Sequence, residues 1–317
     1  MAATASDSTK SAALFGLAAF ALFSGHDVLV KQLGTTYSPF QIVFFTALLS
    51  FPLVTLALMN DKKEGTLRPA HPWWLALRSI SGSASAVFAY YAFSQLPLSQ
   101  AYAILFTAPL IITLLSVPML GETIRIRRGI AILVGLGGVL VVLRPGSSEM
   151  GLGHLAAFFS ASAGALNSII VRKIGHDERA AVMVLYPMMT NFLLTAAVLP
   201  FVYVPVAVGD LGLFAVVALL VLLAMSSLVL AYDRGTAMVV APMQYSQIIW
   251  AAIFGALLFG DFPDWQTYLG TGIIAASSLY IMRRENTASV SKNSPVSRTR
   301  TRIGHALGMR VGSFIKR

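Results

Sequence analysis

Apolar stretches of about 20 residues recur along this chain, and short polar or charged segments separate them. A helix must be about this long to cross the hydrocarbon core of a bilayer. Only 11% of the residues are charged and the mean hydropathy is +0.75, whereas about a quarter of a soluble domain is charged. The sequence therefore predicts an all-α membrane protein with ten transmembrane helices, at residues 12–33, 39–59, 73–95, 98–120, 127–144, 151–172, 180–203, 211–232, 237–260 and 264–283.

The fourth and ninth of these segments have the same layout, which indicates an internal repeat. The aligned positions lie 139 residues apart and pair Phe106 with Tyr245, Thr107 with Ser246, Gly121 with Gly260 and Glu122 with Asp261. Residues 27–34 and 168–175 form a second pair, 141 residues apart. The chain is therefore expected to contain two diverged copies of one five-helix unit, as transporters with internal repeats do.

The distribution of basic residues predicts the orientation in the membrane. If the N-terminus is cytoplasmic, ten Lys or Arg residues fall in inside loops, and the outside loops hold only Lys31 and Arg144. Because five is an odd number, the second copy would then enter the membrane inverted relative to the first. We expect a multi-pass protein of the inner (cytoplasmic) membrane with both termini cytoplasmic.

These observations divide the chain into a polar, disordered lead at 1–11, a first repeat at 12–144, a junction at 145–150, a second repeat at 151–284 and a basic tail at 285–317. The first apolar segment contains His26, Asp27 and Lys31 and has no small-residue cleavage site, which argues against a signal peptide. The net charge of +10 is concentrated in the tail. Such a tail favours anionic lipid over nucleic acid as its partner, either as an amphipathic surface helix or as a solvated segment.

Several motifs resemble the EamA family of the drug/metabolite transporter superfamily. They are FTAPL at 106–110, Leu-Gly-Glu at 120–122, LRPG at 143–146, and the second-half stretch that ends at Gly260-Asp261, where the family usually has Gly-Glu. The resemblance covers residues 12–284. It implies a proton-linked or gradient-linked carrier of small metabolites whose cavity is lined by the first, third, fourth, sixth, eighth and ninth helices, with the fifth and tenth helices peripheral.

His26 and Asp27 are ionisable residues within a predicted span, where a charge at the helix centre costs about 2.5–3.5 kcal/mol. They are therefore the candidates for coupling, as a proton site or a site for a substrate cation facing the cavity. Asp27 lies four residues before Lys31, so the two could instead form an ion pair near the outer surface. The residues alone leave both interpretations open.

Other polar or aromatic residues in the spans are candidate substrate-binding residues, since rings stack and amides donate and accept hydrogen bonds. The alternative for each of them is packing between helices. Pro109 and Pro242 are expected to interrupt their helices beside the site. The candidates, besides His26 and Asp27, are Tyr90, Tyr91, Tyr102, Thr107, Asn167, Gln244, Tyr245, Gln247 and Trp250.

Other residues in the spans are expected to have a structural role rather than to bind a solute. Ser81, Ser83 and Ser85 give the third helix small side chains, and Arg78 is expected to snorkel to the cytoplasmic surface. Glycines in the fifth and tenth helices indicate close contact within one chain or, less well supported, a homodimer.

The sequence contains no P-loop, no metal-binding histidine spacing and no nucleophile elbow, so we expect neither an enzyme nor a cofactor or metal. The favoured function is a secondary active transporter that exports a small organic metabolite, such as an amino acid or a derivative, by alternating access. The alternative is an importer of a vitamin-like or nucleoside-like cofactor. A passive channel or a scaffold is disfavoured by the inverted repeats and by the intramembrane acid.

Overall fold

The structure is a computed structural model that describes residues 2–59, 67–121, 126–144, 151–175, 177–235 and 237–286. All regular secondary structure in these residues is helical, which confirms the predicted all-α class. The elements are α1 (Ala2–Leu33), α2 (Pro39–Met59), α3 (Pro72–Gln95), α4 (Leu98–Leu105), α5 (Ala108–Leu120), α6 (Ile126–Leu143), α7 (Leu152–Ile174), α8 (Ala180–Val202), α9 (Val208–Arg234), α10 (Ala237–Val240), η1 (Ala241–Tyr245), α11 (Ser246–Phe254), η2 (Gly255–Phe259) and α12 (Trp265–Asn286).

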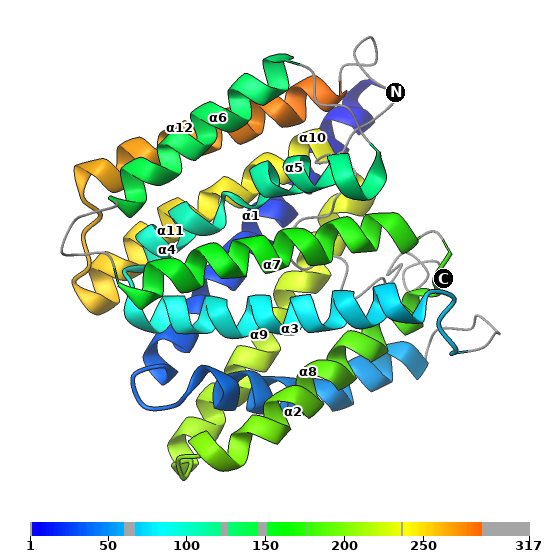
Figure 1. Cartoon of the computed structure of the whole chain (residues 1–317), viewed down its shortest axis with the longest axis vertical. Helices are drawn as coiled ribbons and strands as arrows, with labels where there is room; N and C mark the ends of the chain where they lie inside the picture. The colour runs from blue at the N-terminus through cyan, green and yellow to red at the C-terminus, as the bar shows by residue number, and fades with distance from the viewer. Residues whose placement is uncertain are drawn as a thin grey trace.

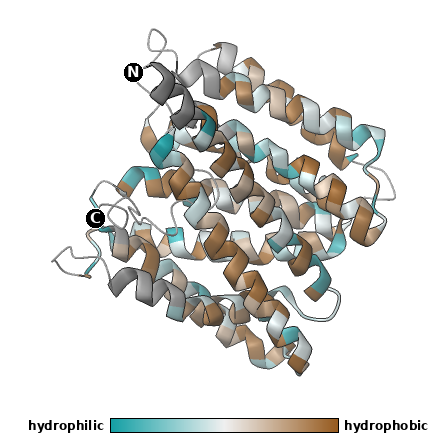
Figure 2. Ribbon diagram, turned by 180° about the vertical axis from the view of Figure 1, so that it is seen from behind, coloured by the Kyte–Doolittle hydropathy of each residue, from teal (hydrophilic) through white to brown (hydrophobic). Residues whose placement is uncertain are grey.

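The helices expose a large apolar surface. Six helical stretches among the described residues are long and apolar enough to cross a membrane. Figure 2 shows hydrophobic residues along most of the helices, and large apolar side chains such as Leu133, Phe201 and Leu257 are at least 70% exposed. A soluble monomer rarely exposes so much apolar surface, so the molecule is a multi-pass membrane protein.

The structure tests the expectation for the N-terminal lead, whereas several other predicted segments lie outside the described residues. The polar lead at 1–11 was expected to be disordered, but α1 begins at Ala2, so residues 2–11 extend the first helix and that expectation is wrong. Helix formation there is favoured because these residues continue a helix that is already nucleated. The junction at 145–150, the acid Glu122 and tail residues 287–317 lie outside the described residues.

The fourth and ninth predicted segments are each divided, and the divisions fall at equivalent residues. α4 ends at Leu105 and α5 begins at Ala108, because Pro109 has no N–H to bond the carbonyl of Leu105. In the second copy, the 3-10 helix η1 follows Val240, includes Pro242 and gives way to α11 at Ser246. Each segment then ends at a glycine in the left-handed region, Gly121 and Gly260, both with φ of 68°.

Each of the main helix pairs joins a helix of the first half to a helix of the second half. α1 packs on α9 and α3 packs on α7, while α2 contacts α8, α6 contacts α12 and α4 contacts α11. If α1 corresponds to α7 and α3 to α9, the first two pairs are copies of each other and the last three are each their own copy. Figure 1 shows α6 beside α12 at one edge of the bundle and α2 beside α8 at the other, with the remaining helices between them.

Polar contacts also join the halves beyond the ends of the spans. In the turn between α1 and α2, the Tyr37 hydroxyl donates to Asp210 over 2.6 Å. Gln41, in the first turn of α2, makes two hydrogen bonds with the backbone of Val204. The hydrogen bond to the Asp210 carboxylate raises the pKa of Tyr37 above its ordinary value, because ionisation of the phenol would remove that donor. Tyr37 therefore remains a donor at neutral pH.

Small residues allow α6 and α12 to approach closely, as the glycine pattern predicted for contact within one chain. A Cβ added at Gly138 would lie 2.9 Å from the carbonyl oxygen of Gly270, and a Cβ at Gly270 would lie 2.7 Å from that of Gly138. Gly137, the next residue in α6, has nothing within 4 Å of such a Cβ. One face of α6 therefore packs on α12, and the side of Gly137 is open.

These neighbouring glycines supply a matched test of the packing. We expect Gly138→Ala to lower the thermal stability of the purified protein, because overpacking costs about 1–3 kcal/mol. Gly137→Ala should leave the melting temperature unchanged or raise it slightly, since alanine has the higher helix propensity. The measurement is the apparent melting temperature in detergent, and equal values for the two variants would contradict the close approach.

Candidate functional site

A cavity of about 360 Å³ lies between the two halves, within the size range of small-molecule sites. Its wall is formed by residues of α1, α2, α3, α4, α5, α7, α8, α9 and η1. Among the described residues α6 and α12 contribute nothing to it, in agreement with their implied peripheral position. The resemblance did not imply α2 and α8, which supply residues such as Thr46 and Asn191.

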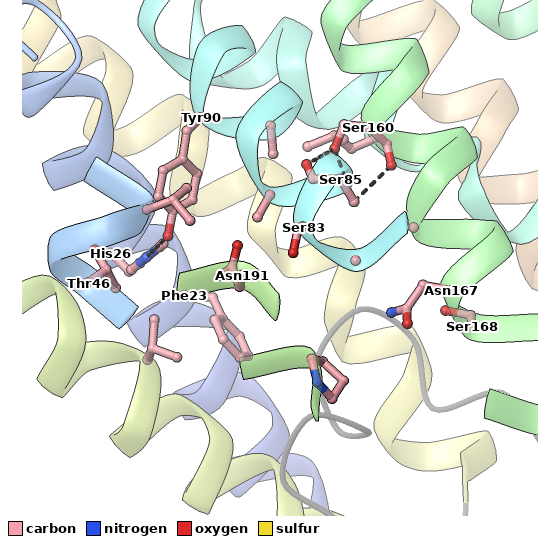
Figure 3. Close-up of a pocket in the computed structure, with 18 of the residues that line it drawn as sticks. Phe23, His26, Thr46, Ser83, Ser85, Tyr90, Ser160, Asn167, Ser168 and Asn191 are labelled. Carbon is pink, nitrogen blue, oxygen red and sulfur yellow. Dashed lines mark hydrogen bonds between the residues drawn. The ribbon is translucent and has the colours of Figure 1, made fainter. Parts of the chain in front are cut away.

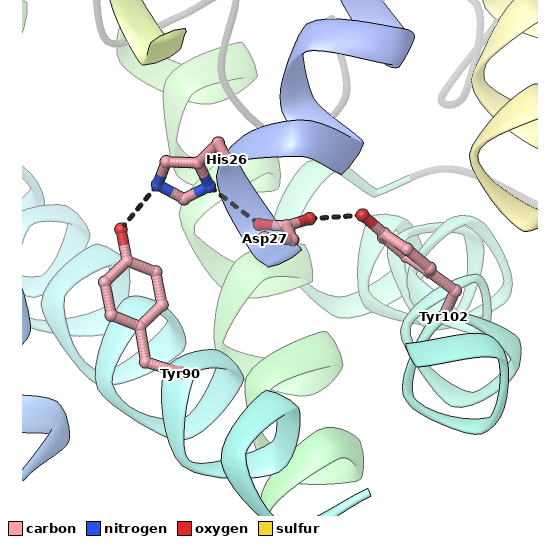
Figure 4. A network of polar contacts seen from close by, with 4 residues as sticks. All are labelled: His26, Asp27, Tyr90 and Tyr102. Atoms are coloured by element: carbon pink, nitrogen blue, oxygen red, sulfur yellow. Dashed lines mark hydrogen bonds and ion pairs between the residues drawn. The ribbon is translucent and has the colours of Figure 1, made fainter. Parts of the chain in front are cut away.

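Ionisable and aromatic side chains form a hydrogen-bonded network at one part of this wall (Figure 4). His26 Nδ1 lies 2.8 Å from Asp27 Oδ1, and His26 Nε2 lies 3.0 Å from the hydroxyl of Tyr90. The hydroxyl of Tyr102 donates to Asp27 Oδ2. His26 is 5% exposed, Asp27 3% and Tyr102 0%, so the protein itself supplies the partners that a carboxylate needs at this depth.

The geometry of this network admits two protonation states of the histidine. If Nδ1 donates to Asp27, a neutral imidazole accepts from the Tyr90 hydroxyl through Nε2. A protonated imidazole would instead donate through both nitrogens, and the tyrosine hydroxyl can serve as donor or acceptor. The network therefore retains its partners when one proton is added.

The ion pair between Asp27 and Lys31 that the spacing allowed is not the pairing that the structure adopts. Lys31 Nζ lies 2.5 Å from Asp261 Oδ2 and donates to the carbonyl of Leu96 over 3.0 Å. It also lies 4.7 Å from the ring centroid of Phe259. The side chain of Lys31 thus links α1 in the first half to the end of the ninth segment in the second half.

Arg78 was expected to snorkel to the surface, and this expectation is wrong. Its side chain is only 2% exposed and lines the cavity, since α3 is covered by α7 and α8. Tyr90 lies twelve residues further along the same helix, a separation of about 18 Å at the rise of an α-helix. The cavity therefore has a charged group near each end of its α3 wall.

Five of the predicted site residues line the cavity: His26, Asp27, Tyr90, Asn167 and Gln244. Figure 3 shows His26, Tyr90 and Asn167 around it. Asn167 comes from α7 and faces Gly82 of α3, where an added Cβ would lie 3.7 Å from its amide. Ser168, beside it, also lines the wall. The sixth predicted span thus contributes neutral polar groups where the equivalent first span contributes His26 and Asp27.

The remaining predicted site residues are not among the lining residues. Tyr102 reaches the site through Asp27, while Tyr91 packs against the main apolar core and Thr107 is fully buried at the division between α4 and α5. Three residues of the ninth segment make other contacts: Tyr245 meets the ring of Phe106, Gln247 is buried at 1% exposure, and Trp250 stacks on Phe254 of its own helix.

Several lining residues were missed in the sequence. Thr46 and Ser50 lie one turn apart in α2, and Asn191 is an amide in the middle of the apolar helix α8. An amide within a span was a usable signal for Asn191, but the resemblance implied a cavity wall that did not include its helix. Among the described residues no group of three or more His, Cys, Asp or Glu could hold a metal ion.

Comparison of the sequence with known proteins finds similarity to membrane transporters. Residues 10–144 match the EamA-like transporter family, which confirms the resemblance for the first half of the chain. An S-adenosylmethionine uptake transporter of Rickettsia bellii is 28% identical over 85% of this chain and 92% of its own length. The pseudopaline exporter CntI of Pseudomonas aeruginosa is 27% identical over 87% of this chain and 98% of its own.

Two further matches extend this result. A riboflavin transporter of Rhizobium johnstonii is 27% identical over 74% of this chain and 78% of its own length. The crystal structure of a protein that is 21% identical has a TM-score of 0.57 over 90% of this chain and 99% of that one, which supports the fold alone. The relatives are therefore transporters of small metabolites, and their names include both uptake and export.

Two tyrosines, one inside the network and one outside it, test the hydrogen bond to Asp27. We expect Tyr102→Phe to destabilise the protein by about 0.6–1.7 kcal/mol, the size of interhelical hydrogen bonds measured in membranes. Tyr91→Phe, which removes a hydroxyl from a core residue outside this network, should leave the apparent melting temperature unchanged. If both variants melt with the wild type, the Tyr102 bond contributes nothing to stability.

Proposed function

This chain carries an EamA-like transporter domain in residues 10–144, and we propose that the whole chain is a secondary transporter of a small organic metabolite. In this proposal residues 12–144 and 151–284 are two inverted five-helix repeats with ten spans, joined by the junction at 145–150. The equivalent helix divisions and the exchanged helix pairs support this arrangement. Alternating access would then follow from movement of one repeat against the other around the cavity between them.

The proposed location is the inner (cytoplasmic) membrane with both termini cytoplasmic. The excess of basic residues in the loops assigned to the inside supports this orientation. The basic tail at 285–317 would contact anionic lipid headgroups. The protein would work as a monomer or a homodimer.

The observation that carries the transport proposal is the buried pair of His26 and Asp27 at the cavity wall. A titratable pair within a membrane span costs free energy and is therefore usually functional, and here hydrogen bonds with two tyrosines stabilise it. Such a pair can bind a proton, or the cationic group of a solute, on one side of the membrane and release it on the other. We therefore assign coupling to His26 and Asp27.

The dimensions of the cavity favour a metabolite larger than a free amino acid. Arg78 and the His26–Asp27 pair lie near opposite ends of a wall about 18 Å long, so a small amino acid would reach only one of them. A derivative with a ring or a longer chain could contact both. The aromatic side chains of Phe23, Tyr90 and Phe106 along the wall suit such a solute.

Export of an amino acid derivative is the direction we favour, and the similarity to a pseudopaline exporter supports it. Import of a vitamin-like or nucleoside-like cofactor is the alternative. Similarity to an S-adenosylmethionine uptake transporter and to a riboflavin transporter supports that alternative. Flux of radiolabelled S-adenosylmethionine, riboflavin and amino acids into and out of proteoliposomes, with and without a pH gradient, would distinguish the two directions.

Replacement of Asp27 tests the assignment of coupling. We expect Asp27→Asn to reduce gradient-driven flux at least about tenfold, because the amide keeps the size of the side chain and loses its titratable proton. The matched control is Asp177→Asn, which neutralises an exposed carboxylate outside the cavity that contacts His71 over 3.2 Å. Wild-type, gradient-dependent flux in Asp27→Asn would contradict the proposal.

The ion pair of Lys31 and Asp261 tests movement between the halves. Lys31→Met and Asp261→Asn should each change the transport rate about threefold to tenfold, because the contact must open and close in each cycle. The exchanged variant Lys31→Asp with Asp261→Lys should recover much of the rate, since the attraction is the same in either direction. A double variant no better than either single one would argue against this role.

A further inference from the structure

Three serines at every second position of α3 differ in how their hydroxyls are bonded. Ser81 donates to the carbonyl of Arg78 over 3.0 Å, and Ser85 donates to the carbonyl of Ser160 over 2.9 Å. The Ser160 hydroxyl returns a bond of 2.8 Å to the carbonyl of Ser85. Ser83 lies between Ser81 and Ser85 in the sequence. Its hydroxyl is buried and has no hydrogen-bond partner among the described residues.

Two other side chains on the cavity wall share this property. The hydroxyl of Thr46 in α2 and the amide oxygen of Asn191 in α8 are buried and lack a partner in the described part of the chain. Ser83 is 6% exposed and Thr46 is 8% exposed, and all three residues line the cavity. Figure 3 shows Ser83 and Asn191 directed into the space bounded by His26, Phe23 and Asn167.

A buried polar atom without a partner costs about 1–3 kcal/mol, so groups of this kind are retained where something else bonds them. Contact between α3 and α7 uses Ser85 and Ser160, which satisfy each other. Packing therefore accounts for Ser85 and leaves Ser83 unexplained. The three unpaired groups face the same cavity from three different helices, which is the arrangement expected of a binding site.

We propose that Thr46, Ser83 and Asn191 form a subsite for an uncharged, hydrogen-bonding part of the transported solute, an inference that rests on the proposed function. A hydroxyl both donates and accepts, while an amide oxygen only accepts. The matching solute group is thus one that can do both, a hydroxyl or a primary amide. Apolar residues such as Val221, Leu222 and Met225 also line the cavity.

The subsite adds a second chemical requirement to the one that His26 and Asp27 place on the solute. The solute would carry an ionisable group for His26 and Asp27, a hydroxyl or amide for Ser83 and its neighbours, and apolar or aromatic surface between them. A purely apolar organic cation would leave the three polar groups unpaired, and the site would discriminate against it.

Stability of the unliganded protein gives the first test. Because Ser83→Ala and Thr46→Val remove unpaired groups, we expect the apparent melting temperature to stay the same or to rise. Ser85→Ala should lower it, because it leaves the hydroxyl of Ser160 without one of its partners. If Ser83→Ala lowers the melting temperature as much as Ser85→Ala does, the Ser83 hydroxyl is bonded within the protein and the proposal is overturned.

Access to the cavity gives a test that needs no knowledge of the substrate. The chain contains no cysteine, so a single introduced thiol is the only one present. Ser83→Cys should react with 2-aminoethyl methanethiosulfonate at least about tenfold faster than Ser81→Cys, the matched control two residues away that does not line the cavity. Equal rates would overturn the proposal.

Binding gives the final test, with S-adenosylmethionine and riboflavin as the probes. For a probe that the wild type transports, Ser83→Ala and Thr46→Val should raise the concentration at half-maximal flux about fivefold or more, and Ser81→Ala should not. Unchanged values in Ser83→Ala would overturn the subsite. If the wild type transports neither probe, that result counts against the proposed solutes, and the stability and labelling results still decide the subsite.

Discussion

The cost of a charged or polar group in hydrocarbon is the constraint on which the rest of this structure depends. Asp27 can lie in the middle of the bundle because His26 and Tyr102 bond both of its carboxylate oxygens, and Tyr90 extends the network across to α3. Those partners come from three helices, so the network also orients α1, α3 and α4 relative to one another. The same hydrogen bonds therefore supply partners for the Asp27 carboxylate and position the helices that form the cavity wall.

The divided helices make room for that cavity. Pro109 and Pro242 each remove a backbone donor, and the chain changes direction at Phe106 and at Tyr245, whose rings then contact each other with centroids 5.1 Å apart. Because the two divisions meet where the halves face each other, the bundle is interrupted at its centre rather than at its edge. The peripheral pair α6 and α12, in contrast, packs at the distance of glycine backbones and has no comparable opening.

Most of the fold could be predicted from local features of the sequence. The lengths of the apolar segments, the positions of Pro109 and Pro242, and the aligned pair of Gly121 and Gly260 reappear as helix limits, divisions and left-handed caps. The first helix was predicted too short, because its polar lead was expected to be disordered, whereas it continues a helix that is already nucleated. The site was predicted less well: His26, Asp27 and Asn167 line the cavity, while Gln247 and Trp250 are not among its lining residues.

The sequence by itself determined which segments are apolar helices and where two of them are divided, because these depend on composition and on neighbours a few residues away. Only the tertiary structure decided which face of each helix meets the cavity. Lys31 pairs with Asp261, 230 residues distant, instead of Asp27 four residues away, and Arg78 lies inside because α7 and α8 cover α3. The rotation of a helix about its axis is determined by packing against remote segments, and no local pattern contains that information.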